Sequence, residues 1–152
     1  MKKVCFICSA GGHLEQIRQL QPIANTYDCF YVTVKTKATE HIKERKYFSD
    51  DLNRKSKFAG IISICRMFFQ QMKIFLLEKP DAIITTGAAV AIPMCIIGHF
   101  FKKKVIYIES YARMNSVNRS GKVIYRVADL FIVQWQELLR YYPKAVYGGC
   151  IY

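Results

Sequence analysis

The sequence predicts an α/β domain in which helices cover both faces of a parallel sheet. Five short runs rich in β-branched and aromatic residues alternate with helical segments, and this alternation is typical of right-handed βαβ crossovers. The first run, 4–8, is apolar at every position, which indicates a strand buried on both faces. A chain of 152 residues is most simply one domain, so we expect a single Rossmann-like unit over residues 1–152.

The expected elements alternate along the chain. Proline 80 ends the longest helix, because the residue before a proline disfavours the helical conformation. Residues 35–57 hold eight basic and four acidic residues, so we expect a solvated loop with one helical turn there. The predicted strands are 4–8, 29–34, 81–86, 104–108 and 130–133, and the predicted helices are 14–24, 61–77, 90–101, 117–128 and 134–142.

The net charge of +12 predicts an anionic partner: nucleic acid, an anionic membrane surface or a phosphorylated substrate. No known nucleic-acid motif accompanies the charge, and the aromatic residues lie in apolar stretches, which disfavours nucleic acid. No secretory signal is visible, and no apolar run is expected to reach the roughly 18 to 20 residues that span a bilayer. We therefore expect a cytoplasmic protein that can bind a membrane surface.

Two helices, 61–77 and 90–101, have wider apolar faces than packing on one sheet requires. We expect the surplus on the first, including Phe68 and Phe69, to contact another protein or the lipid interface. Basic side chains beside it would reach anionic head groups, and the alternative is a centrally buried helix. The polar residues at helical spacing in 61–77 are Ser63, Arg66, Gln70 and Lys73.

Ligands in such a sheet bind beyond the carboxyl ends of the strands. Paired glycines let the backbone approach a ligand, and the N–H groups of the following helix can face a phosphate. A histidine at this edge can accept a proton near neutral pH. The candidates are Gly11, Gly12 and His13 after the first strand, Thr86 and Gly87 after the third, and Glu109, Ser110, Tyr111 and Arg113 after the fourth.

Each of these motifs also has a plain structural explanation. His13 fits a solvated strand-to-helix turn, Thr86 and Gly87 fit a simple turn, and Glu109 fits a salt-bridged structural acid. Their meeting at one edge of the sheet favours a site. The three histidines are far apart and no acid or cysteine stands at ligand spacing, so we expect neither a metal nor a cofactor.

Five blocks of the sequence carry a resemblance to a known family. They are ICSAGGH (7–13), TGAAVAIP (86–93), VIYIES (105–110), ADLFIVQW (128–135) and YPKAVYGG (142–149). Together they resemble small bacterial capsule-biosynthesis proteins that enhance a partner galactosyltransferase. These are similar in turn to the accessory subunit of the eukaryotic two-protein transferase that adds the second GlcNAc to a dolichol-linked sugar.

The resemblance implies the N-terminal, acceptor-binding half of a GT-B glycosyltransferase that is split into two polypeptides. Gly11, Gly12 and His13 then correspond to the acceptor-side glycine-rich loop of relatives such as the peptidoglycan GlcNAc transferase. His13 is the implied base, and Glu109 lies in the same cleft. The eukaryotic subunit has an N-terminal membrane anchor, which we do not expect here, so attachment would use basic and apolar surface.

We therefore expect a subunit of a UDP-sugar-dependent glycosyltransferase for capsular or exopolysaccharide repeat units, peripheral on the cytoplasmic face of the membrane. Its expected partners are a donor-binding subunit of similar size, a sugar on undecaprenyl diphosphate and an anionic membrane surface. His13 would deprotonate the acceptor hydroxyl in an inverting displacement, and the chain alone would be inactive. The alternatives are a noncatalytic scaffold that recruits the transferase and, less favoured, a basic nucleic-acid-binding domain.

Overall fold

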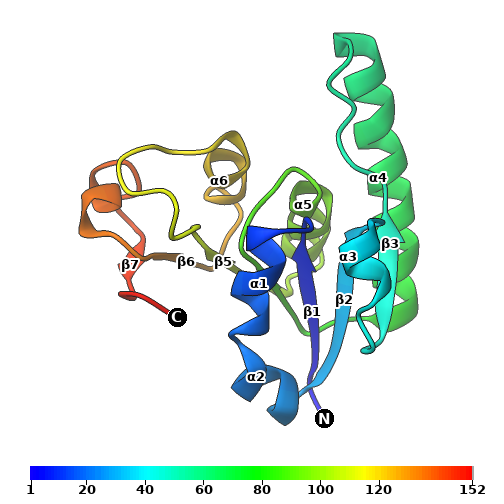
Figure 1. Cartoon of the computed structure of the whole chain (residues 1–152), viewed down its shortest axis with the longest axis horizontal. Helices are drawn as coiled ribbons and strands as arrows, with labels where there is room; N and C mark the ends of the chain where they lie inside the picture. Colours follow the sequence, from blue (N-terminus) through cyan, green and yellow to red (C-terminus); the bar gives the residue numbers. More distant parts are fainter. Residues whose placement is uncertain (152) are drawn as a thin grey trace.

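The structure, a computed structural model, describes residues 1–151, and the backbone alone of residue 57. Its centre is a seven-stranded sheet with the order β3-β2-β1-β4-β5-β6-β7 (Figure 1). All neighbouring strands are parallel, which confirms the expected fold class. The strands are β1 Lys3–Cys8, β2 Asp28–Val34, β3 Lys46–Ser49, β4 Ala82–Thr85, β5 Lys104–Ile108, β6 Leu130–Val133 and β7 Val146–Tyr147.

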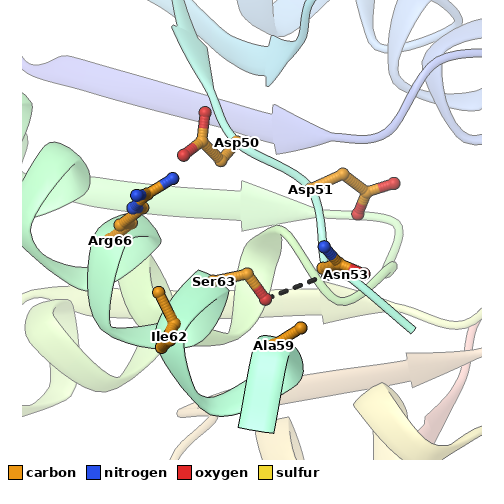
Figure 2. Close-up of a pocket in the computed structure, with 7 residues that line it drawn as sticks. All are labelled: Asp50, Asp51, Asn53, Ala59, Ile62, Ser63 and Arg66. Atoms are coloured by element: carbon orange, nitrogen blue, oxygen red, sulfur yellow. Dashed lines mark hydrogen bonds between the residues drawn. The ribbon is translucent and has the colours of Figure 1, made fainter. Parts of the chain in front are cut away.

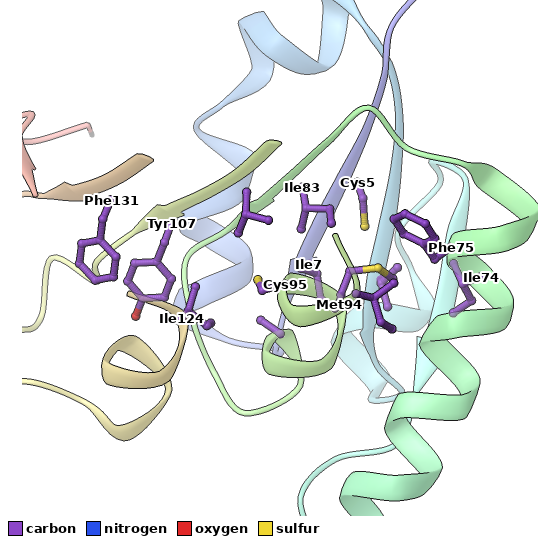
Figure 3. Close-up of a cluster of buried hydrophobic side chains, with 14 of the residues drawn as sticks. Cys5, Ile7, Ile74, Phe75, Ile83, Met94, Cys95, Tyr107, Ile124 and Phe131 are labelled. Atoms are coloured by element: carbon purple, nitrogen blue, oxygen red, sulfur yellow. The ribbon is translucent and has the colours of Figure 1, made fainter. Parts of the chain in front are cut away.

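Helices cover both faces of this sheet. Cys5 and Ile7 of β1 belong to the larger hydrophobic cluster, beneath α4 and α5 (Figure 3). Phe6 and Cys8 point the other way and pack with α1 residues, so β1 is buried on both faces as expected. The helices are α1 Gly12–Arg18, α2 Gln21–Thr26, α3 Lys37–Glu40, α4 Lys57–Glu78, α5 Ala91–Phe100, α6 Arg119–Ile124 and the 3-10 helix η1 Gln136–Arg140.

Four predicted helices have different bounds in the structure. The helix expected over 14–24 is two helices, because α2 begins anew at Gln21 with Pro22 in its first turn, and proline cannot donate the bond that a continuous helix needs. Helix α4 begins before residue 61, where the Ser56 side chain accepts from the Ala59 N–H at 3.1 Å. The segments 117–128 and 134–142 contain only the short α6 and the 3-10 helix η1.

Two strands were not predicted. The segment expected to be a solvated loop, 35–57, contains the single turn α3 and also the edge strand β3. This strand has only four residues and begins with Lys46, so its sequence resembles a polar loop. Short strands with charged residues are typical of sheet edges. The other missed strand, β7, has two residues and forms the opposite edge.

The N-terminal half of α4, with the segment that precedes it running alongside, projects beyond the sheet (Figure 1). By length and composition alone, it is long and apolar enough over Phe58–Glu78 to cross a membrane, which corrects the expectation that no run is long enough. Only 28% of its most apolar stretch is buried in the fold. The buried side of this helix includes Met67, Gln71 and Phe75.

Candidate functional site

The loops after β1 and β4 meet where the strand order reverses. The Thr86 hydroxyl donates to the carbonyl oxygen of His13 at 2.9 Å. Gly87 has a φ of +112°, and a Cβ there would lie 3.0 Å from the Tyr107 hydroxyl and 3.4 Å from the His13 ring. Glycine therefore permits the close packing of the two loops at the place where open α/β sheets bind ligands.

A cleft of about 930 Å³ lies at this edge, within the usual size of a ligand site. Three segments form its walls: the loop after β1, residues 50–56 together with the helix starts of α4 and α5, and residues 110–120. The lining residues are Ser9, His13, Asp51, Leu52, Asn53, Arg54, Ser56, Gly60, Ala88, Ala89, Ile92, Ser110, Ala112, Arg113, Val117, Asn118, Arg119 and Ser120.

The cleft is positively charged. Arg54, Arg113 and Arg119 line it, against the single carboxylate of Asp51. Arg54 and Arg119 form no ion pair with another residue of the described part of the chain. A guanidinium group without an ion-pair partner in a cleft can donate two parallel hydrogen bonds to the oxygens of a phosphate.

His13 is half-buried and lines the cleft. Its Nδ1 atom is buried and has no hydrogen-bond partner among the described residues. Burial lowers the pKa of His13 from its ordinary 6.5, the main chain of Thr86 partly opposes this, and the charge of Arg113 lowers it further. This lowered pKa favours the neutral imidazole, the form that can accept a proton.

Glu109 lies beneath the cleft and is fully buried. Its Oε1 accepts from the Ser110 N–H at 2.9 Å and from Asn118 Nδ2 at 2.8 Å, and the hydroxyls of Tyr107 and Tyr142 donate to its two oxygens at 3.2 and 3.4 Å. Burial raises its pKa, and the hydrogen bonds from Ser110, Tyr107 and Tyr142 and the charge of Arg113 oppose the rise. Glu109 is not one of the residues that line the cleft.

Of the other predicted residues, some line the cleft and others lie outside its lining. Ser110 lines the cleft and accepts from Gln16 Nε2 at 3.2 Å. Gly11 and Gly12 are exposed, with no atom within 4 Å of a Cβ built on either, whereas Thr86 is buried. The ring of Tyr111 packs on Trp135, with centroids 4.8 Å apart, outside the lining of the cleft.

Several residues that line the cleft are not among the predicted site residues. Arg54 lies in the segment expected to be a solvated loop, and nothing local distinguishes it from the other basic residues there. Asn118 precedes α6 and its side chain accepts from the Gly121 N–H as a helix cap, a signal that the sequence does contain. Arg119 is the first residue of α6.

Residues 50–53 are tied to the first half of α4. The Asn53 N–H donates to the Ser63 hydroxyl at 3.0 Å (Figure 2), and the Asp50 N–H donates to Gln70 Oε1 at 2.9 Å. Ser63 and Gln70 therefore face this segment and not solvent or lipid, and the contact places Arg54 at the cleft. A side groove of about 420 Å³ lies here, lined by Asp50, Asp51, Asn53, Ala59, Ile62, Ser63 and Arg66.

Exposed apolar side chains cover the outer side of α4 and the end of α5. Phe69 is 70% exposed, whereas Phe68 is half-buried against the larger hydrophobic cluster. Arg66 and Lys73 are exposed on the same helix. The exposed apolar residues of the two helices and the turn after α5 are Phe58, Ile61, Ile62, Ile64, Phe69, Leu76, Leu77, Ile96, Phe100 and Phe101.

Comparisons with known proteins give consistent matches. The family model described as "Oligosaccharide biosynthesis protein Alg14 like" matches residues 53–151. The UDP-N-acetylglucosamine transferase subunit ALG14 of Mus musculus is 34% identical over 104 residues, which is 64% of this chain and 48% of that protein. The subunit of the same name from Yarrowia lipolytica is 26% identical over 157 residues, which is 98% of this chain and 68% of that protein.

The crystal structure of Acinetobacter baumannii MurG superposes with a TM-score of 0.74 at 18% identity, over 90% of this chain and 43% of that one. This likeness shows the fold, that of one half of a GT-B protein. The chain spans less than half the length of the mouse relative.

Proposed function

Because the chain belongs to the family of Alg14-like oligosaccharide biosynthesis proteins, we propose that it is the acceptor-side subunit of a membrane-associated glycosyltransferase. In this proposal it binds a sugar linked to a lipid diphosphate, and a second chain supplies the nucleotide-sugar site. The two relatives described above are named as subunits of a UDP-N-acetylglucosamine transferase. Their names support a two-chain enzyme and make UDP-GlcNAc the donor to test first.

The observation that carries this proposal is a basic cleft bordered by helices with exposed apolar faces. Gly60 of α4 and Ile92 of α5 line the cleft, and the same two helices carry the exposed apolar surface. A lipid-linked diphosphate needs both features, because its phosphates require cations while its lipid tail remains in the bilayer. Attachment to the cytoplasmic face of the membrane through α4 is part of this proposal.

His13 is the proposed general base. It lines the cleft, and its lowered pKa favours the neutral form. It would take the proton of the attacking acceptor hydroxyl as that oxygen bonds to the anomeric carbon. The bond between the anomeric carbon and the diphosphate of the donor then breaks, with inversion. Stabilisation of the leaving diphosphate is assigned to the partner chain.

A noncatalytic scaffold is the second candidate, and one observation favours it. Glu109, expected to act in the cleft beside His13, is buried beneath it, so catalysis by this chain would depend on His13. Under the scaffold hypothesis, a His13→Ala variant keeps full turnover in the assembled enzyme. Under the catalytic hypothesis, the same variant loses it.

Acceptor binding tests the proposal without the partner. Binding to vesicles that contain a polyprenyl-diphosphate-linked GlcNAc should exceed binding to vesicles that contain an equal charge of phosphatidylglycerol. Arg54→Ala with Arg119→Ala should remove the difference, and Lys144→Ala, a change at an exposed lysine outside the cleft, should preserve it. Equal binding of the unaltered chain to both kinds of vesicle would count against acceptor recognition.

The biological setting predicted from the sequence remains part of the proposal. Capsular synthesis by galactosyl transfer onto undecaprenyl diphosphate stays a prediction, because both relatives are named as subunits of a UDP-N-acetylglucosamine transferase. Transfer from UDP-galactose and from UDP-GlcNAc, each offered undecaprenyl-linked and dolichyl-linked acceptors, distinguishes these settings.

A further inference from the structure

Glu109 has no access to an acceptor in the cleft. It directly follows β5, its exposed fraction is 0%, and it is not among the lining residues. A carboxylate that takes or gives a proton in the reaction must reach the acceptor hydroxyl directly or through one water. Burial and position therefore argue against a proton-transfer role for Glu109.

Four donors converge on this carboxylate. The Ser110 N–H, Asn118 Nδ2 and the Tyr107 hydroxyl donate to Oε1 at 2.9, 2.8 and 3.2 Å, and the Tyr142 hydroxyl donates to Oε2 at 3.4 Å. Every partner is a donor, so the carboxylate acts as an acceptor-only anchor. Removing it would leave buried donors without partners, which is costly.

Two of the four donors, Ser110 and Asn118, lie at the two ends of one wall of the cleft. Ser110 begins the segment 110–120, and Asn118 lies near its end, where its side chain also caps α6 through the Gly121 N–H. Between them lie Ala112, Arg113 and Val117, which line the cleft. One carboxylate thus ties both ends of a segment whose middle faces the ligand.

Gly121 shows how closely this anchor is packed. A Cβ at this position would lie 2.9 Å from Glu109 Oε2, 2.8 Å from the Tyr142 hydroxyl and 2.9 Å from Asn118 Oδ1. Only a glycine lets the start of α6 approach the carboxylate this closely. Arg119, two residues earlier, is the first residue of α6 and lines the cleft, so its position depends on how α6 packs there.

We propose that Glu109 is a positioning residue, which fixes the 110–120 wall and thereby the two arginines of that wall, Arg113 and Arg119, beside the acceptor diphosphate. This inference rests on the proposed acceptor-side function. In this proposal Glu109 does not transfer a proton. It acts by holding Ser110, Asn118 and the segment between them in place.

The test compares Glu109→Gln with Glu109→Ala in the chain assembled with its donor-binding subunit, assayed with UDP-GlcNAc and a lipid-diphosphate-linked sugar. Glutamine keeps an acceptor oxygen, so kcat should stay within about fivefold, whereas loss of a general acid or base costs roughly 10²–10⁴-fold. Alanine should raise KM for the acceptor roughly tenfold or more, because the buried donors lose their partner. Glu137→Gln, at an exposed glutamate of η1, is the matched control.

A fall of 100-fold or more in kcat for Glu109→Gln at unchanged KM would overturn the proposal in favour of direct catalysis. Hydrogen exchange of the 111–117 amides supplies a readout that needs no transfer reaction. It should rise in Glu109→Ala and stay near normal in Glu109→Gln, and equal exchange in both would also overturn the proposal. A wild-type complex without transfer activity refutes the proposed function, while the exchange result still decides the role of Glu109.

Tyr107→Phe is a second variant in case Glu109→Ala does not fold. It removes one donor to the carboxylate from a buried position outside the cleft lining. We expect a severalfold rise in acceptor KM and in exchange of 111–117, with kcat little changed. No change in either quantity would refute an anchor built on this network.

Discussion

Membrane binding through the outer side of α4 can be tested with two substitutions. Phe58 and Phe69 are 74% and 70% exposed, and 11 positions on a helix of 3.6 residues per turn place them about 20° apart on one face. Phe58→Ser with Phe69→Ser should release the protein from anionic liposomes. The fold should be unaffected, since neither side chain belongs to the hydrophobic clusters.

The size of the effect follows from the exposed area. Full burial of a phenylalanine contributes roughly 1.5–3 kcal/mol, so two side chains with about 70% of their surface available contribute about 2–4 kcal/mol. The double variant should therefore bind liposomes roughly 30-fold more weakly or worse, at about 1.4 kcal/mol for each factor of ten. Phe68 is excluded from this test, because it packs against the larger cluster and its loss would weaken the fold.

Co-sedimentation with liposomes, with circular dichroism as a check on folding, measures this effect. Tyr27→Ser is the matched control, an exposed aromatic residue after α2. Unchanged binding of the folded double variant would contradict membrane attachment through this face of α4.

Four further outcomes are expected. His13→Ala should lower kcat roughly 100-fold or more in the assembled enzyme and leave association with the partner unchanged, as measured by steady-state kinetics and gel filtration. The lowered pKa of His13 places the acidic limb of the rate profile below the ordinary value of 6.5, and a limb above that value would contradict the assignment. The pKa of Glu109 is raised in the folded state, so ionising Glu109 lowers the free energy of unfolding as the pH rises through that pKa. Wild type should therefore gain stability relative to Glu109→Gln as the pH falls toward about 4.3, the unfolded-state value. Urea unfolding at several pH values measures this difference. Gly121→Ala should destabilise the fold by about 1–3 kcal/mol through overpacking, and an unchanged thermal midpoint would contradict the contacts drawn around that glycine.

The central strands were predictable because their burial leaves a local pattern. Every position of the 4–8 run is apolar, and the structure sends alternate residues to opposite clusters. Helix α5 was equally clear, with Pro93 near its start. The edge strand β3 has no such pattern, because a short edge strand with a lysine resembles a solvated loop.

The edge that carries the cleft was also predictable, but the depth of each side chain was not. His13, Ser110 and Arg113 line the cleft, and their roles in binding and catalysis stay predictions. Glu109 is at the predicted edge but points beneath it, toward Tyr107 and Asn118. Arg54 lies at the cleft beside residues 50–53, which form hydrogen bonds with α4. Such long-range contacts leave no local pattern in the sequence.

Reconstituted sugar transfer tests whether this chain and a donor-binding subunit share one active site. The chain, its candidate donor-binding subunit and the two together are each incubated with UDP-GlcNAc and a lipid-diphosphate-linked sugar, and the extended product is measured. We expect product only when both chains are present, and its loss when His13 is replaced by alanine. Robust transfer by either chain alone, or full activity of the complex with His13→Ala, would contradict a shared active site to which this chain contributes the acceptor side and the base.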